Sequence, residues 1–241
     1  MSFGAAASSY DAGRPGYPPE AVRWTLPEGA RRVLDLGAGT GKLSQAVAAL
    51  GVDVVAVEPD DAMRALIPVD ALAGTAEEIP LPDASVDAVV VGQAFHWFDA
   101  ARALPEMMRV LRPGGTIGLF WNLYDDDVPW VSAFAGVWQP EARVSVARQF
   151  DDPPFEGPAV GLSTPEREWF RHEQPVDGVV LETQLRSISH FILLPPDERE
   201  ELIAQALAQV PAGTVALPQV CDTWRYTRLR QGVAAAGLHP S

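Results

Sequence analysis

A short apolar run followed by three closely spaced glycines constrains the fold of this chain more than any other feature. It occupies residues 33–41, which read VLDLGAGTG, and a helical pattern follows from Lys42. Glycine lets the backbone turn tightly and approach a ligand without a collision at Cβ. In an open parallel sheet, the turn after the first strand lies at the carboxyl edge, where ligands bind. The segment therefore predicts a ligand-binding turn in an α/β protein.

Apolar runs alternate with helical patterns over residues 31–122, which is typical of βαβ units around a mostly parallel sheet. The expected strands are residues 32–36, 52–58, 71–73, 86–91 and 116–121, followed by two more near 166–173 and 219–229. The expected helices are residues 42–50, 100–111, 178–190 and 197–210, with a short helix opened by Pro18 and Pro19.

At 241 residues the chain is long enough for one large domain and too short for two of full size. After Trp121 the pattern loosens, which indicates a cap inserted between regular elements. We therefore expect a single domain over residues 1–241. Its parts are an N-terminal cover (1–29), a ligand-binding core (30–122), a cap insertion (123–165), and C-terminal strands and helices (166–241).

The charge of the chain bears on its partners. Lys and Arg number 18 and Asp and Glu number 32, so the formal net charge is −14. Such a chain repels phosphate backbones and anionic membrane surfaces, and we expect neither nucleic acid nor a membrane as partner. Cys221 is the single cysteine, and the chain opens without a basic leader or a long apolar run. These features predict a cytoplasmic protein, and they leave its oligomeric state open.

The second expected strand ends in Glu58, a carboxylate placed to accept hydrogen bonds from ribose hydroxyls beside the glycine turn. A nicotinamide or flavin site uses a similar turn, with pyrophosphate on the helix N-terminus. Its G-x-G-x-x-G pattern, counted from Gly37, needs glycine at the position of Lys42. The spacing argues against an NAD(P)-dependent oxidoreductase, which stays as an alternative.

Four motifs, in order, resemble those of the class I S-adenosylmethionine-dependent methyltransferases. Residues 34–41 resemble their glycine-rich motif I, 57–59 their acidic second motif, 74–81 their adenine-side loop, and 109–115 their post-core turn. The resemblance implies S-adenosylmethionine as cofactor and methyl transfer to a small-molecule acceptor. It also implies a Rossmann-like fold, with a mostly parallel seven-stranded sheet, helices on both faces and a helical cap.

Two further segments are similar to one branch of that family. Residues 10–18 read YDAGRPGYP and residues 93–98 read QAFHWF, which resemble the type 11 branch that includes trans-aconitate methyltransferase-like proteins. A non-catalytic protein that binds S-adenosylmethionine is a second alternative. Whether oxygen, nitrogen or carbon is methylated stays open.

The resemblance also implies a cofactor map. In this map the amino-acid portion contacts Asp35, Gly37, Ala38 and Gly39, and the ribose contacts Glu58, with Pro59 and Asp60 around it. The adenine contacts Ala76 and Glu77, Gln93 lines the methionyl side, and Tyr10 and Arg14 close over it. The family often has an acidic residue where this chain has Thr75, so the contact to the adenine amino group stays open.

His96 follows the fourth expected strand and is the predicted catalytic residue. An imidazole with an unperturbed pKa of ~6.5 can accept a proton from a hydroxyl or amine acceptor. A structural histidine among Phe95, Trp97 and Phe98 is the alternative. The acidic run 125–127 favours a solvated helix N-terminus, so no metal site is predicted. Aromatic candidates for an acceptor pocket, which more often serve packing, are Tyr124, Trp130, Trp138, Trp169 and His190.

Overall fold

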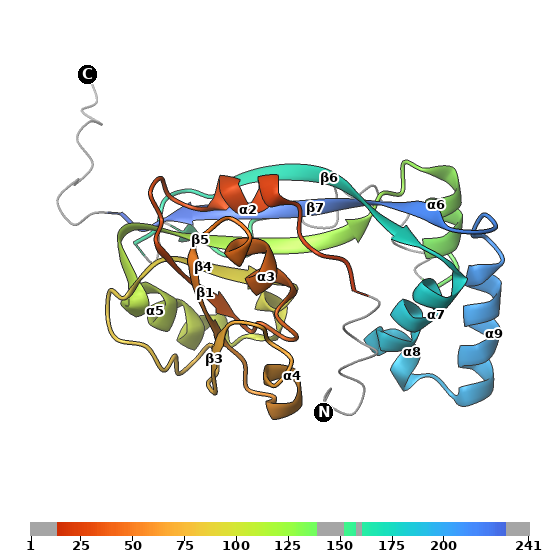
Figure 1. Cartoon of the computed structure of the whole chain (residues 1–241), viewed down its shortest axis with the longest axis horizontal. Helices are drawn as coiled ribbons and strands as arrows, with labels where there is room; N and C mark the ends of the chain where they lie inside the picture. The colour runs from red at the N-terminus through yellow and green to blue at the C-terminus, as the bar shows by residue number, and fades with distance from the viewer. Residues whose placement is uncertain (1–13, 139–151, 158–160, 230–241) are drawn as a thin grey trace, which may run out of the picture.

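The computed structural model describes residues 14–138, 152–157 and 161–229, and a single seven-stranded sheet organises them (Figure 1). The strands, in their order across the sheet, are β3 (Asp70–Leu72), β2 (Asp53–Val57), β1 (Arg32–Leu36), β4 (Val86–Gly92), β5 (Leu111–Tyr124), β7 (Val215–Thr227) and β6 (Glu166–Val176). Strands β1 to β5 are parallel, and β7 runs antiparallel to both β5 and β6. The predicted α/β fold with a mostly parallel sheet is confirmed.

The helices of the described residues cover the sheet and extend beyond one end of it. They are α2 (Pro19–Thr25), α3 (Lys42–Ala48), α4 (Asp61–Arg64), the 3-10 turn η2 (Phe95–Trp97), α5 (Ala100–Val110), α6 (Pro129–Ala135), α7 (Gly178–Ser187), α8 (Ser189–Leu193) and α9 (Pro196–Leu207). None of them is long and apolar enough to cross a membrane.

Successive apolar side chains of the central strands point to opposite sides of the sheet, so both of its faces are apolar. In β1, Val33 joins a core cluster with α2 and α3, whereas the next residue, Leu34, joins a cluster with α5 on the other face. Val89 and Val90 of β4 divide in the same way. Strands buried on both faces are expected where helices cover a parallel sheet, since successive side chains point to opposite sides.

A third apolar cluster lies at the end of the molecule where α6, α7, α8 and α9 gather, at the right of Figure 1. It contains Phe134 of α6, Leu181 of α7, Phe191 of α8 and Ile203 of α9, all at most 3% exposed. The segment after Trp121 and the C-terminal helices therefore share one core. The four-part division of residues 1–241 stays a prediction.

Three strands are longer than expected, and their pairing explains why. β5 continues to Tyr124 because residues 116–124 pair without interruption with β7. β6 and β7 in turn pair over the whole of Glu166–Val176, beyond the predicted end at residue 173. This extension carries the sheet toward α6–α9, and it brings Tyr124 opposite Gln219.

Candidate functional site

A cavity of about 660 Å³ opens at the carboxyl edge of β1, β2, β4 and β5 and reaches to α6 and α7. A volume of this size is within the ~300–1,000 Å³ typical of small-molecule sites. Of the predicted site residues, those on its wall are Arg14, Asp35, Gly37, Ala38, Gly39, Glu58, Pro59, Ala76, Glu77, Gln93 and His96. Tyr10 lies outside the described residues.

The glycine turn after β1 forms one wall of the cavity. Gly37, Gly39 and Gly41 have φ of +69°, +58° and +85°, a backbone region that favours glycine. The N–H of Gly37 donates to the carbonyl of Val57 at 2.9 Å, which ties the turn to the end of β2. A Cβ on Gly39 would meet no atom within 4 Å, because that side of the turn faces open space. The turn therefore presents bare backbone to a ligand.

Glu58 is fixed at the end of β2 by the neighbouring backbone. Its Oε2 accepts the N–H of Gly39 at 2.8 Å, and its Oε1 accepts the N–H of Asp60 at 2.9 Å. The side chain is 6% exposed, and burial raises the pKa of its carboxyl above the usual value. A carboxylate has further lone pairs, so Glu58 can still accept the hydroxyls of a ribose.

Asp35, at the end of β1, is fully buried, and only one of its two carboxylate oxygens has a hydrogen-bond partner among the described residues. Its Oδ2 accepts the hydroxyl of Ser44 at 2.6 Å, whereas its Oδ1 has no partner among the described residues. Burial raises the pKa of the Asp35 carboxyl to about 7. A buried acceptor without a partner is costly. Because Asp35 lines the cavity, a bound cation or N–H donor would remove that cost.

Asp60 lies beside Glu58 and caps α4, and its place around a ribose stays a prediction. It is absent from the cavity wall, and its Oδ1 accepts the N–H groups of Ala62 and Met63, which caps the start of α4. A short polar side chain in this position satisfies N–H groups that a helix leaves unpaired. The N–H of Asp60 in turn holds Glu58.

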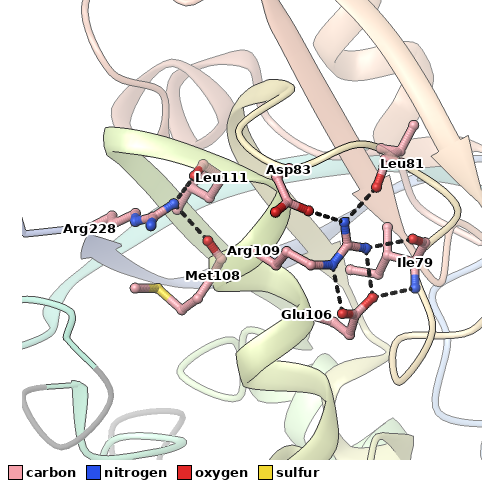
Figure 2. A network of polar contacts seen from close by, with 8 residues as sticks. All are labelled: Ile79, Leu81, Asp83, Glu106, Met108, Arg109, Leu111 and Arg228. Atoms are coloured by element: carbon pink, nitrogen blue, oxygen red, sulfur yellow. Dashed lines mark hydrogen bonds and ion pairs between the residues drawn. The ribbon is translucent and has the colours of Figure 1, made fainter.

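The loop that carries Ala76 and Glu77 is held to α5 by Arg109 (Figure 2). The guanidinium donates to the carbonyls of Ile79 and Leu81 at 2.8 and 2.7 Å, and to Asp83 at 2.9 Å. It also forms a two-point contact with Glu106 at 2.7 and 2.8 Å, and Glu106 accepts the N–H of Ile79 at 2.9 Å. Arg109 thus acts as a clamp on the loop, and it holds the pKa of Glu106 below its usual value.

A similar contact anchors the other side of the same helix end. Arg228, after β7, donates to the carbonyls of Met108 and Leu111 (Figure 2). Arg228 therefore anchors the start of the turn at residues 109–115, whereas Arg109, the first residue of that turn, holds the neighbouring loop.

Gln93 follows β4 at the centre of the carboxyl edge and has φ of +55°, which is uncommon for a residue other than glycine. Its Nε2 donates to the carbonyl of Asn122 at 2.9 Å. The Asn122 side chain in turn donates to the carbonyl of Gly16 at 3.0 Å and lies 3.1 Å from Nε2 of His172. These contacts hold the segment that carries Arg14 over the cavity.

His96 lies on the cavity wall in η2, beside Trp97, with ring centroids 5.0 Å apart. Partial loss of water around the ring lowers the pKa of His96 from its usual value, which favours the neutral imidazole. Phe95 is buried in the core, and Trp97 is 66% exposed. The structure thus places a neutral imidazole on the cavity wall, and its catalytic role stays a prediction.

Several wall residues were not in the predicted site. Asn122 and Tyr124 end β5, Ser132 lies on α6, Gln184 lies on α7, and Gln219 lies near the start of β7. Asn122 and Tyr124 could have been predicted from their place at the carboxyl end of a strand, where ligands bind. Tyr124 was already a candidate as an aromatic residue. Of the other aromatic candidates, Trp138 is buried in the α6–α9 core and Trp169 is exposed on β6.

The acidic run before α6 is partly neutralised. The carboxylates of Asp125, Asp126 and Asp127 lie within 4.8 Å of one another, and Arg171 of β6 donates to Asp125 at 2.9 Å and to Asp127 at 2.7 Å. An arginine in this position lowers the demand for a metal ion. The absence of a metal stays a prediction.

Comparison with known proteins identifies the family. Residues 34–119 match the family model described as a methyltransferase domain. An uncharacterized methyltransferase of Mycobacterium tuberculosis is 60% identical over 136 residues, which cover 54% of this chain and 56% of that protein. A methyltransferase-like protein of Schizosaccharomyces pombe, also uncharacterized, is 35% identical over 217 residues, which cover 85% of this chain and 84% of that protein. The chain belongs to the methyltransferase family.

Solved structures show the same fold. A candidate type II methyltransferase from Anaeromyxobacter dehalogenans matches with a TM-score of 0.64 at 24% identity, over 89% of this chain and 97% of that one. Phospholethanolamine N-methyltransferase 2 of Haemonchus contortus, in complex with phosphomonomethylethanolamine and S-adenosylhomocysteine, matches with a TM-score of 0.55 at 13% identity, over 94% of this chain and 58% of that one. The Rossmann-like methyltransferase fold is therefore shown for this chain. Its placement in the trans-aconitate methyltransferase-like branch stays a prediction.

Proposed function

We propose that this protein transfers a methyl group from S-adenosylmethionine to a small-molecule acceptor bound in the same cavity. The observation that carries the proposal is the half-satisfied Asp35 beside a glycine turn whose open side faces the cavity. Membership of the methyltransferase family supports it, and a protein of the same fold binds S-adenosylhomocysteine.

The residues on the wall fit the chemistry of this cofactor. Asp35 Oδ1 is a buried acceptor in need of a donor, which an α-ammonium group supplies. Glu58, held by two N–H groups, offers its remaining lone pairs to the two hydroxyls of a ribose. The loop fixed by Arg109 places Thr75, Ala76 and Glu77 on the wall for the adenine. Pro59 also lines the cavity, and the N–H of Asp60 helps to hold Glu58.

S-adenosylmethionine, when bound, supplies a methyl group that is already activated by its positive sulfur. The protein therefore has to align the acceptor and exclude water, and alignment alone is worth ~7–11 kcal/mol. Gln93 and Asn122 lie where the cofactor half of the cavity meets the half that reaches α6 and α7. Their mutual hydrogen bond fixes that junction.

His96 is the proposed general base. It takes a proton from the group that receives the methyl, where that group must lose one. The lowered pKa of His96 favours the neutral ring, which is the form that accepts a proton. His96 lies on the wall of the same cavity as the glycine turn.

A small molecule is favoured over nucleic acid or a membrane as the partner. The net charge of −14 repels polyanions, and a cavity of about 660 Å³ suits a cofactor with a small acceptor. A cytoplasmic location belongs to the same proposal and rests on the single cysteine and the lack of a membrane-spanning helix among the described residues.

Transfer of label tests the proposal directly. The protein is incubated with S-adenosylmethionine that carries a ¹³C-methyl group and with a small-molecule extract, and mass spectrometry then follows the label. A labelled small product is expected. No product, together with binding of S-adenosylhomocysteine, would favour a non-catalytic binding protein; no binding of either form of the cofactor would overturn the proposal.

A further inference from the structure

The half of the cavity farthest from the glycine turn is walled by neutral polar side chains. Its residues come from the end of β5, from α6 and α7, and from the start of β7, and we call it the amide compartment. Its polar wall residues are Tyr124, Ser132, Gln184, Ser187 and Gln219. Nonpolar surface beside them comes from Ala135, Gly136 and Ile188.

Two glutamines of this wall are fixed by a third that lies behind them. Nε2 of Gln184 and Nε2 of Gln219 both donate to Oε1 of Gln174, at 3.0 and 3.3 Å. Gln184 is 4% exposed and Gln219 is 2% exposed. The shared acceptor sets which way each amide points. Because the nitrogen of Gln219 is used by Gln174, its carbonyl oxygen is the atom left to accept a hydrogen bond from a ligand.

Tyr124 lies beside Gln219 in the sheet. It is the register partner of Gln219 across β5 and β7, and directly opposed side chains share a face of the sheet. Phe134 and Trp138 pack edge-on against its ring. Burial raises the pKa of Tyr124 to about 12, so its hydroxyl stays protonated. The pair offers one fixed acceptor and one hydroxyl that can donate or accept.

Two residues of opposite charge also line the cavity, and the positive charge of Arg14 acts on the Tyr124 hydroxyl. Asp126 precedes α6 and Arg14 belongs to the N-terminal segment, and both line the cavity. Their opposite charges favour neither an anion nor a cation. The five polar wall residues themselves carry no charge at pH 7, so none of them can pair with an ionised group that loses its water there. Buried amides are costly unless they are hydrogen-bonded, which makes such a wall selective for a ligand that can bond to it.

We propose that the amide compartment holds the methyl acceptor, and that it selects a small uncharged molecule whose hydroxyl or amide N–H donates to the Gln219 carbonyl. Gln174 is the positioning residue that orients both wall glutamines. This inference rests on the proposed function, since it names the acceptor class for that reaction.

The acceptor class is tested without knowing the acceptor. A small-molecule extract is separated by ion exchange into anionic, cationic and neutral fractions before the reaction, because methylation can itself remove a charge. Each fraction is then offered to the protein with methyl-labelled S-adenosylmethionine. Label in a product of the neutral fraction is expected. Label confined to products of a charged fraction would overturn the inference and leave the proposed function intact; no label in any fraction would overturn both.

Variants then test the wall itself. The initial rate on the diluted neutral fraction, which reports kcat/KM, should fall ~10-fold in Gln219→Leu, since one net hydrogen bond is worth up to about that factor. The same rate should fall by a similar factor in Gln174→Met, because this change releases both wall amides. In Gln219→Glu, activity should shift toward the cationic fraction. Gln205→Leu, on the exposed face of α9, is the matched control. It should change neither the rate on the neutral fraction nor the preference between fractions.

Binding of S-adenosylhomocysteine separates a local from a general defect. Its affinity should stay within about twofold in all four variants, because no contact of the cofactor half changes. Unchanged rates in Gln219→Leu and Gln174→Met, with affinity intact, would overturn the role of the amides. A parallel loss of affinity would show a structural role instead and would equally contradict the inference.

Discussion

The two halves of the cavity are built by different means. The cofactor half is made mainly of backbone: glycines with positive φ, the N–H groups that hold Glu58, and a loop bound through its carbonyls by Arg109. The amide compartment is made of side chains from four elements, which are brought together by the extension of β5, β6 and β7. Backbone geometry suits a ligand that never changes, whereas side chains can be exchanged to suit a different acceptor.

The difference predicts where substitutions act. Changes in the cofactor half should alter affinity for the shared cofactor, and changes in the outer half should alter the choice of acceptor. Substitutions near the junction should act on turnover.

The largest effect is expected at Gly39. Gly39→Val adds a branched side chain to the open side of the turn, at φ of +58°, and should lower affinity for S-adenosylhomocysteine by ~100-fold or more. Gly213→Val is the matched control, because it has φ of +88°, equally open space and no place on the cavity wall. Isothermal titration calorimetry measures both. Equal losses in the two variants would point to backbone strain rather than to a lost cofactor contact.

Substitution of His96 should act on turnover and spare cofactor affinity. If the ring takes a proton, His96→Ala should lower turnover by ~100-fold, since general base catalysis contributes ~100- to 10,000-fold. His96→Gln should fare little better, because an amide cannot accept the proton. Near-normal turnover in both variants would leave alignment and exclusion of water as the mechanism.

Asp35 should make cofactor binding depend on pH. With a pKa of about 7 in the free protein, Asp35 must release a proton to pair with an ammonium group. Affinity for S-adenosylhomocysteine should therefore fall ~10-fold per unit below pH 7 and level off above it. Asp35→Asn should bind more weakly and lose this dependence. A pH-independent affinity in the unsubstituted protein would contradict the pairing.

Ionisation of the Asp35 carboxyl should have the opposite effect on folding. A rise in pH that favours cofactor binding should lower the free energy of unfolding of the ligand-free protein. Burial raises its pKa in the folded state, so the ligand-free fold binds more protons than the unfolded chain between about pH 4 and 7. Its contribution to the free energy of unfolding is present at low pH and is lost as the pH rises through 7. Denaturant unfolding of Asp35→Asn should lack that loss.

The smallest effect is expected at Arg109. Arg109→Leu frees the loop that carries Ala76 and Glu77, and should lower the free energy of unfolding by about 2 kcal/mol and cofactor affinity severalfold. Arg186→Leu, which breaks exposed ion pairs with Glu182 and Glu200, should cost under about 1 kcal/mol and spare affinity. If both variants bind equally well, the clamp has no role in positioning the loop.

The cofactor half could largely be predicted from the sequence because its elements are local. The residues from Val33 to Gly41 hold a strand, a turn and a helix start in one run, and Glu58 ends the next strand along the chain. The helix-capping role of Asp60 was not predicted, because the sequence does not show which neighbouring N–H groups a short acidic side chain will accept. Of the amide compartment, Tyr124 was a candidate but the glutamines were not predicted, since the pairing of Gln174, Gln184 and Gln219 depends on the tertiary fold and leaves no spacing signal.

The central claim is that the cavity binds S-adenosylmethionine and its product rather than NAD. Thermal unfolding measured separately with S-adenosylhomocysteine and with NAD tests this claim most directly. At a concentration of 100 times its dissociation constant, S-adenosylhomocysteine should stabilise the folded chain by about 2.7 kcal/mol, which appears as a clear rise in melting temperature. NAD should produce none, because Lys42 occupies the position where its pattern needs glycine. A rise with NAD and none with S-adenosylhomocysteine would contradict the account.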